Sequence, residues 1–338
     1  MAATRAFARS SSHGILFKLL TAKQYTSLCV TYFQNSAVVV NDEVRDALSD
    51  GHGVVALETT IVVHGLPAPM NLEVARQCEA AVRANGSVPA TIGVLHGRVV
   101  VGLTTQELEQ LASPERDVAK LSARDLGLAV GTMRDGATTV AGTIAVAHRV
   151  GIDVMATGGL GGVHRDAAQN YDESADLTAL SRTQVLVVAS GVKSILDIGA
   201  TLERLDTLGV PVVGYQTSQF PGFYRSDSGF ALDWSVANEH EVVAAFVAHR
   251  EFTPTGFLLA NPVAVEHQLD ATLHEEALES ALALVQSTGV SGKDVTPVLL
   301  GEFARYTAGA SVEVNRDLVV ANAELAGKVA TALASARA

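Results

Sequence analysis

The sequence predicts an α/β protein in which helices cover both faces of a mostly parallel central sheet, a three-layer α/β/α fold. Short β-branched runs alternate with amphipathic helical segments along the chain, which is typical of successive βαβ units. Hydrophobic residues make up 48% of the 338 residues but aromatic residues only 5%. The core must therefore be built from Ala, Val, Leu and Ile, as in sheets buried on both faces.

The individual elements follow from these patterns. Val54–Leu57, Thr183–Ala189, Val210–Tyr215 and Gly256–Ala260 are predicted to be strands, and 89–102 is predicted to be a hairpin that turns at His96-Gly97. Helices are expected at 42–50, 71–85, 144–150, 239–249 and 275–286, with an Ala-rich last helix after Asn315. No repeat or linker divides the chain after residue 40, so residues 41–335 are predicted to form a single domain.

Residues 1–40 differ in composition from the remainder. No Asp or Glu occurs before Asp42, whereas Arg, Lys and a Ser run are present, a composition that resembles an organellar transit peptide. The alternative is a disordered extension without a targeting role. We expect a cytoplasmic protein, or a mitochondrial one if residues 1–40 are a transit peptide.

Charge and cysteine content exclude several classes of protein. The net charge of −12 argues against a nucleic-acid-binding surface, which requires a cationic footprint. Two cysteines, Cys29 and Cys78, cannot supply a disulfide framework or a multi-cysteine zinc site. We expect neither a nucleic-acid partner nor a membrane span, but a local basic pocket for a small anionic substrate is compatible with the overall charge.

The stretch from Ala156 to Asp176 is the most conspicuous candidate site. It follows an apolar run at 150–155 and places four glycines within five residues, at 158, 159, 161 and 162. In open α/β sheets ligands bind at the carboxyl ends of strands. His164, Arg165, Asp166, Asp172, Glu173 and Asp176 follow the glycines. This composition suits a phosphorylated ligand with a divalent metal, although a solvated turn whose acids begin a helix has the same pattern.

Two further residues stand out because each follows a predicted strand. Glu58 comes directly after Val54–Leu57, and burying a carboxylate there is costly without a partner or purpose. It is either a functional acid or a capping or salt-bridged one. Lys193 lies at a strand-to-helix turn, where the helix amino end disfavours its charged form. A Schiff-base nucleophile, a phosphate-binding lysine and a surface lysine are all open interpretations.

Weaker signals surround these residues. Lys120, taken alone, is interpreted as a solvent-exposed lysine. Thr138–Thr143 precedes a helix and could hold an anion at its amino end or act as an ordinary cap.

Several long motifs together carry a family resemblance. They read ALETTIVVHGLPAP at 56–69, PATIGVLHGRVVVGL at 89–103, AKLSARDL at 119–126, TTVAGT at 138–143, ATGGLGGVHR at 156–165, YDESADL at 171–177 and ASGVKSILDIGAT at 189–201. The sequence resembles the pseudouridine-5′-phosphate glycosidase (pseudouridylate synthase) family, also called the indigoidine synthase A-like family, over residues 40–335.

The resemblance implies a lyase of the hydro-lyase type with glycosidase activity in pseudouridine catabolism, which reversibly converts pseudouridine 5′-phosphate and water to uracil and ribose 5-phosphate. It implies Lys193 as the nucleophile that forms a Schiff base with the ring-opened sugar, and Glu58 as the proton donor. Further roles implied are metal binding by Asp172, usually of manganese, and substrate contacts by Lys120, Val140, Ser174, Ala175 and Asp176. His164 and Asn315 are expected near the site, and the assembly is expected to be a homotrimer.

Two other hypotheses remain open from the residues alone. One is a related carbon–carbon lyase or aldolase that uses Lys193 on another sugar phosphate. The other is a metabolite-binding protein that has kept the pocket and lost the chemistry.

Overall fold

The computed structural model describes residues 37–290 and 295–337. The folded unit begins at Val38, because the first strand, Val38–Val40, pairs with Arg98–Val101. Three residues assigned to the amino-terminal extension from the sequence are therefore part of the sheet. The predictions for residues 1–36, including Cys29, lie outside the described residues.

The sheet within the described chain has eleven strands. They are β1 (Val38–Val40), β2 (Val54–Leu57), β3 (Val88–Leu95), β4 (Arg98–Val101), β5 (Ala119–Leu121), β6 (Gly136–Thr138), β7 (Val154–Ala156), β8 (Leu186–Ala189), β9 (Val212–Tyr215), β10 (Ser235–Val236) and β11 (Phe257–Ala260). The order along the sheet is β1-β4-β3-β2-β7-β8-β11-β9-β10, with β6 attached to β3 and β5. All pairs are parallel except β3–β4 and β3–β6, which confirms a mostly parallel sheet.

Helices connect the strands. They are α2 (Asp42–Ser49), η2 (Ile61–Gly65, a π-helical turn), α3 (Met70–Ala84), α4 (Thr105–Leu111), η3 (Ala123–Asp125, a 3₁₀ turn), α5 (Leu126–Gly131), α6 (Val140–Val150), α7 (Ala167–Asn170), α8 (Ala175–Leu180), α9 (Ile198–Thr207), α10 (Glu239–Phe252), α11 (Ala271–Thr288), α12 (Val295–Tyr306) and α13 (Ala310–Arg337).

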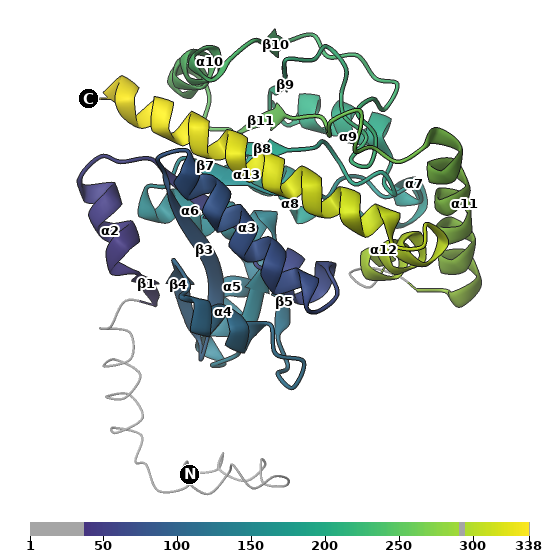
Figure 1. The fold of residues 1–338 in the computed structure, drawn as a ribbon, viewed down its shortest axis with the longest axis horizontal. Coiled ribbons are helices and arrows are strands. Elements are labelled where there is room, and N and C mark those ends of the chain that lie inside the picture. Colours follow the sequence, from purple (N-terminus) through teal and green to yellow (C-terminus); the bar gives the residue numbers. More distant parts are fainter. Residues whose placement is uncertain (1–36, 291–294, 338) are drawn as a thin grey trace, which may run out of the picture. The chain divides into compact units, whose positions relative to one another are not determined.

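The folded unit has the predicted three layers (Figure 1). Helices α3 and α13 pack on each other and cover one face of the sheet, where α13 crosses β2, β7 and β8. Helices α6 and α8 pack together on the opposite face, with α6 against β2, β3 and β7. The central strands β2, β7, β8 and β11 are completely buried, since helices cover both of their faces.

Helix α13 is longer than expected. It begins at Ala310 and runs for 28 residues, so Asn315 lies inside the helix rather than before it. By length and composition α13 could cross a membrane, but 56% of its apolar window is buried inside the folded unit. Its apolar residues are used in packing against α3 and the sheet.

The α6 boundary also differs from the prediction. Thr139 caps the helix through Gly142 N, so α6 begins at Val140, and Gly151 ends it in the left-handed conformation. Strand β7 starts only at Val154 because Val150 is still helical. The carboxyl ends of β2, β7, β8 and β11 lie next to one another, and the candidate site is found there.

Candidate active site

A narrow cavity of about 50 Å³ lies at the carboxyl ends of the central strands. Glu58 follows β2, Thr157 follows β7, Lys193 follows β8 and Lys120 lies on β5. These four line the cavity together with Thr60, Ile61, His64, Gly65, Gly158, Gly159, Phe223, Thr296, Pro297, Leu300 and Asn315. The lining of one cavity therefore contains the two residues predicted to be catalytic, Glu58 and Lys193, and the predicted substrate-binding residue Lys120.

Glu58 is partly buried in the lining of this cavity. The Thr157 hydroxyl donates a hydrogen bond to its carboxyl oxygen Oε1. Burial raises the pKa of Glu58, while the nearby Lys193 ammonium and the Thr157 hydrogen bond act in the opposite direction. The net direction favours a protonated carboxyl, the form that a proton donor requires.

A tightly packed turn positions Lys193. Its backbone N–H donates to Leu160 O at 3.2 Å, which ties the turn to the glycine-rich stretch. Gly191 has a φ of +79°, and a side chain there would collide with the carbonyl oxygen of Pro221. The Arg165 guanidinium donates to the carbonyls of Ser194 and Ile195 at 3.4 and 3.3 Å. The backbone on both sides of Lys193 is therefore fixed by hydrogen bonds or close contacts.

Asn315 contributes an unusual acceptor to the cavity. Its side chain is 6% exposed, and among the described residues its Oδ1 atom has no hydrogen-bond partner. A buried amide oxygen without a partner costs about 1–3 kcal/mol. This cost is removed when a bound molecule donates a hydrogen bond there.

The glycines of the predicted phosphate loop allow close packing. A side chain at Gly159 would overlap the ring of Phe223, and one at Gly161 would overlap Ser174. Their backbone approaches its neighbours more closely than a Cβ atom permits. The glycines therefore allow the backbone to pack closely around the cavity.

The other predicted substrate residues form a neighbouring cluster outside the cavity lining. Asp176 is 5% exposed and accepts hydrogen bonds from Ala141 N and Gly161 N, both at 2.9 Å. Ser174 caps α8 and Ala175 is its first residue, while Val140 begins α6 and is buried. The Asp176 carboxylate joins the amino end of α6 to the glycine-rich stretch and is close enough to Glu58 to raise its pKa.

Asp172 lies beside His164, outside the lining of the cavity, with 3.9 Å between its Oδ2 and the imidazole Nδ1. Burial lowers the pKa of His164 and Asp172 raises it, while Lys120 and Lys193 add to the lowering. No group of three His, Cys, Asp or Glu side chains arranged to hold a metal occurs in the described part of the chain. A single, partly exposed carboxylate fits only a hard ion that keeps most of its waters.

A family model described as "Indigoidine synthase A like protein" matches residues 43–332. The chain belongs to this family. The chain is 57% identical to a pseudouridine-5′-phosphate glycosidase from Salinispora tropica, over 88% of this chain and 92% of that protein. It is 53% identical to a protein of the same name from Streptomyces griseus, over 88% and 93%.

Two solved structures have the same fold. The prealnumycin C-glycosynthase AlnA, in complex with ribulose 5-phosphate, superposes with a TM-score of 0.83 at 37% identity and covers 90% of this chain and 99% of its own. An indigoidine synthase A-like protein from Thermotoga maritima gives a TM-score of 0.79 at 35% identity, over 88% and 96%.

Two residues of the site, Thr157 and Asn322, were not predicted from the sequence. Asn322 of α13 is completely buried and its Nδ2 donates to the carbonyl of Thr157 at 2.8 Å. Its Oδ1 accepts from Asn261 Nδ2 at 2.9 Å, and its Nδ2 lies 3.1 Å from the hydroxyl of Ser190. One helix residue therefore holds the carboxyl ends of β7, β8 and β11. The only sequence signal was a polar residue within an apolar helical face.

Proposed function

We propose that this chain is a pseudouridine-5′-phosphate glycosidase, which uses water to cleave pseudouridine 5′-phosphate reversibly into uracil and ribose 5-phosphate. The observation that carries the proposal is that Lys193 and a Glu58 with a raised pKa line one buried cavity. The names of the relatives at 57% and 53% identity support the same reaction.

Cleavage of the carbon–carbon bond requires a covalent intermediate, which the lysine provides. Uracil leaves through C5, a poor leaving atom, so a pair of carboxylates alone is insufficient. The amine of Lys193 bonds to C1′ as the C1′–O4′ bond of the ribose breaks, and O4′ takes up the proton that the amine loses. The C1′–C5 electron pair then passes to the uracil ring while the nitrogen forms an imine with C1′. Glu58 delivers its proton to C5. Water then hydrolyses the imine, which releases ribose 5-phosphate and returns the amine.

Asn315 is proposed to bind the base. The imide edge of uracil offers an N–H donor between two carbonyl acceptors. The Asn315 amide has the complementary acceptor and donors, and its Oδ1 is one of the buried atoms that lack a partner among the described residues. Hydrogen bonds of this kind discriminate strongly between bases, because an unmatched ligand leaves a buried polar group unpaired.

The phosphorylated sugar is proposed to contact Lys120, Val140 and Ser174–Asp176. His164, whose pKa is lowered by burial, is proposed to lie near the sugar. Asp172 would hold manganese or another hydrated divalent ion, which would supply positive charge and ordered water. The resemblance is also the basis for proposing a homotrimer, which sedimentation velocity tests.

The location of the protein is proposed to be cytoplasmic, as the relatives in the comparison are bacterial. Amino-terminal sequencing of the endogenous protein tests the mitochondrial alternative, which rests on residues 1–40.

Uracil release tests the reaction. Purified protein is incubated with pseudouridine 5′-phosphate and manganese, and uracil is followed by chromatography. Absence of uracil across several divalent metals would refute the proposal and leave a binding protein, and cleavage of a different sugar phosphate would favour the aldolase hypothesis. Borohydride should trap a ribose 5-phosphate adduct on the wild type and none on Lys193→Ala. An adduct on the variant would reassign the nucleophile.

A further inference from the structure

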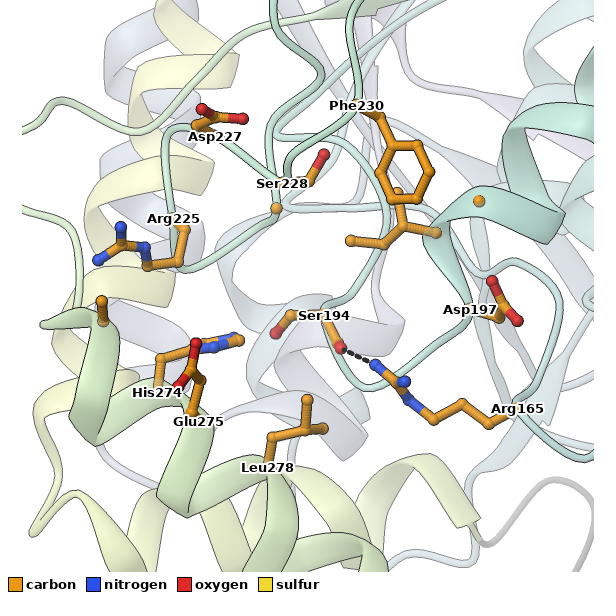
Figure 2. A pocket seen from close by; sticks show the side chains of 14 residues that line it. Arg165, Ser194, Asp197, Arg225, Asp227, Ser228, Phe230, His274, Glu275 and Leu278 are labelled. Carbon is orange, nitrogen blue, oxygen red and sulfur yellow. Dashed lines mark hydrogen bonds between the residues drawn. The ribbon is translucent and has the colours of Figure 1, made fainter.

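A second and larger cavity of about 420 Å³ lies beside the turn that carries Lys193 (Figure 2). Its lining comes from four segments: Arg165, the Ser194–Gly199 turn, the loop at 222–230 and the first turns of α11. In the described part of the chain it shares no lining residue with the catalytic cavity. The volume is within the range of small-molecule sites.

Two buried polar atoms in this cavity lack partners among the described residues. They are the hydroxyl oxygen of Ser194, a residue only 3% exposed, and Nε2 of His274. Figure 2 shows the imidazole of His274 pointing towards the Ser194 side chain. Buried polar groups in native structures are usually hydrogen-bonded, so two such atoms in one cavity indicate a bound molecule that supplies the missing partners.

The charges around these atoms favour an anion at the inner end. Arg165 and Arg225 both line the cavity, and each is held by backbone carbonyls, Arg225 by Leu269 O at 3.0 Å. Helices α9 and α11 begin at the cavity wall with Ile198 and Ala271. Each helix amino end adds positive potential, which is partly offset by a capping carboxylate, Asp197 in α9 and Asp270 in α11.

Three carboxylates line the same cavity. Asp197 caps α9 by accepting from Ala200 N, and Asp227 accepts from Gly229 N. Glu275 is the third and lies on α11 beside His274. Carboxylates repel a second anionic group but accept hydrogen bonds from hydroxyls. The cavity is therefore matched to a ligand with one anionic end and a hydroxylated remainder.

We propose that this cavity binds a small hydroxylated phosphate ester, with the phosphate among Ser194, His274 and Arg225 and the hydroxyls toward Asp227 and Glu275. A phosphate offers several acceptor oxygens for the serine, imidazole and guanidinium donors. Because Ser194 directly follows Lys193 in the chain, the ligand contacts the residue next to the nucleophile. The proposal does not depend on the reaction assigned to the catalytic cavity.

Calorimetric titration with glycerol 3-phosphate tests the second site. The titration uses the full chain with Lys120→Ala and Lys193→Ala, so that the catalytic cavity is impaired and no turnover occurs. We expect one molecule bound per chain. Adding Arg225→Met should weaken binding at least tenfold, whereas Arg98→Met, on an exposed residue of β4, should leave it unchanged.

A second variant distinguishes loss of binding from loss of the fold in Arg225→Met. Leu278→Phe enlarges a residue in the cavity wall and keeps every polar group, so it should also weaken binding while the melting temperature stays close to that of the parent. Glycerate, which has a carboxylate in place of the phosphate, should bind at least tenfold more weakly than glycerol 3-phosphate. No binding at millimolar ligand, binding indifferent to both Arg225→Met and Leu278→Phe, or a preference for glycerate would each overturn the proposal.

Discussion

Replacing Asn322 by Leu should destabilise the protein by several kcal/mol. The substitution keeps a side chain of similar size but removes the amide that donates to Thr157 O at 2.8 Å and accepts from Asn261 Nδ2 at 2.9 Å. Each buried partner left unpaired costs about 1–3 kcal/mol. The two together predict a loss of about 2–6 kcal/mol, a large fraction of the stability of most domains.

Urea unfolding followed by circular dichroism measures this loss as a lower midpoint with an unchanged slope. Asn85→Leu is the matched control, because the Asn85 amide makes one hydrogen bond within its own helix end, to Ala81 O at 2.8 Å. It should cost about 1 kcal/mol. A loss below about 1 kcal/mol in Asn322→Leu would refute the claim that this amide holds the three strand ends together.

Three further outcomes follow from the site. Thr157→Val removes a hydrogen bond that favours ionised Glu58. The pKa of Glu58 should therefore rise, and the alkaline limb of the pH–kcat/KM profile should move to higher pH. Thr157→Ser keeps the hydroxyl, so an equal movement of the limb in that variant would show that the hydrogen bond is not the cause. Gly191→Ala should slow borohydride trapping at Lys193 and lower the free energy of unfolding more than Gly151→Ala does. Both glycines have positive φ, but only Gly191 lies against another backbone segment, at Pro221. Equal losses of stability in the two variants would argue against this contact. Burial raises the pKa of Cys78 to about 12, so in a Cys29→Ser variant iodoacetamide at pH 8 should modify the thiol only after unfolding, as peptide mass spectrometry would report.

Much of the fold could be predicted because the central strands are short apolar runs that are buried on both faces. Strands Val54–Leu57 and Phe257–Ala260 lie where their patterns place them. Several boundaries differ, and two of them, the starts of α6 and α13, are positions where a polar residue was interpreted as preceding the helix. Asn315 resembles a helix start, yet tertiary burial keeps it inside α13.

Glu58 and Lys193 could be located from the sequence because each immediately follows a buried strand. Thr157 and Asn322 could not, since their importance depends on which strands are neighbours. The order β2-β7-β8-β11 brings together residues that are more than a hundred positions apart, such as Glu58 and Lys193. Local patterns carry no information about that order.

The position of α13 has a consequence for biosynthesis. Asn315 and Asn322 belong to α13, so the cavity and the strand ends acquire these groups only after residues 310–337 have been synthesised and have packed on the sheet. A nascent chain that stops before Ala310 has the lysine and the glutamate but lacks the helix that covers this face of the sheet. Such a chain should be inactive and should expose apolar sheet surface.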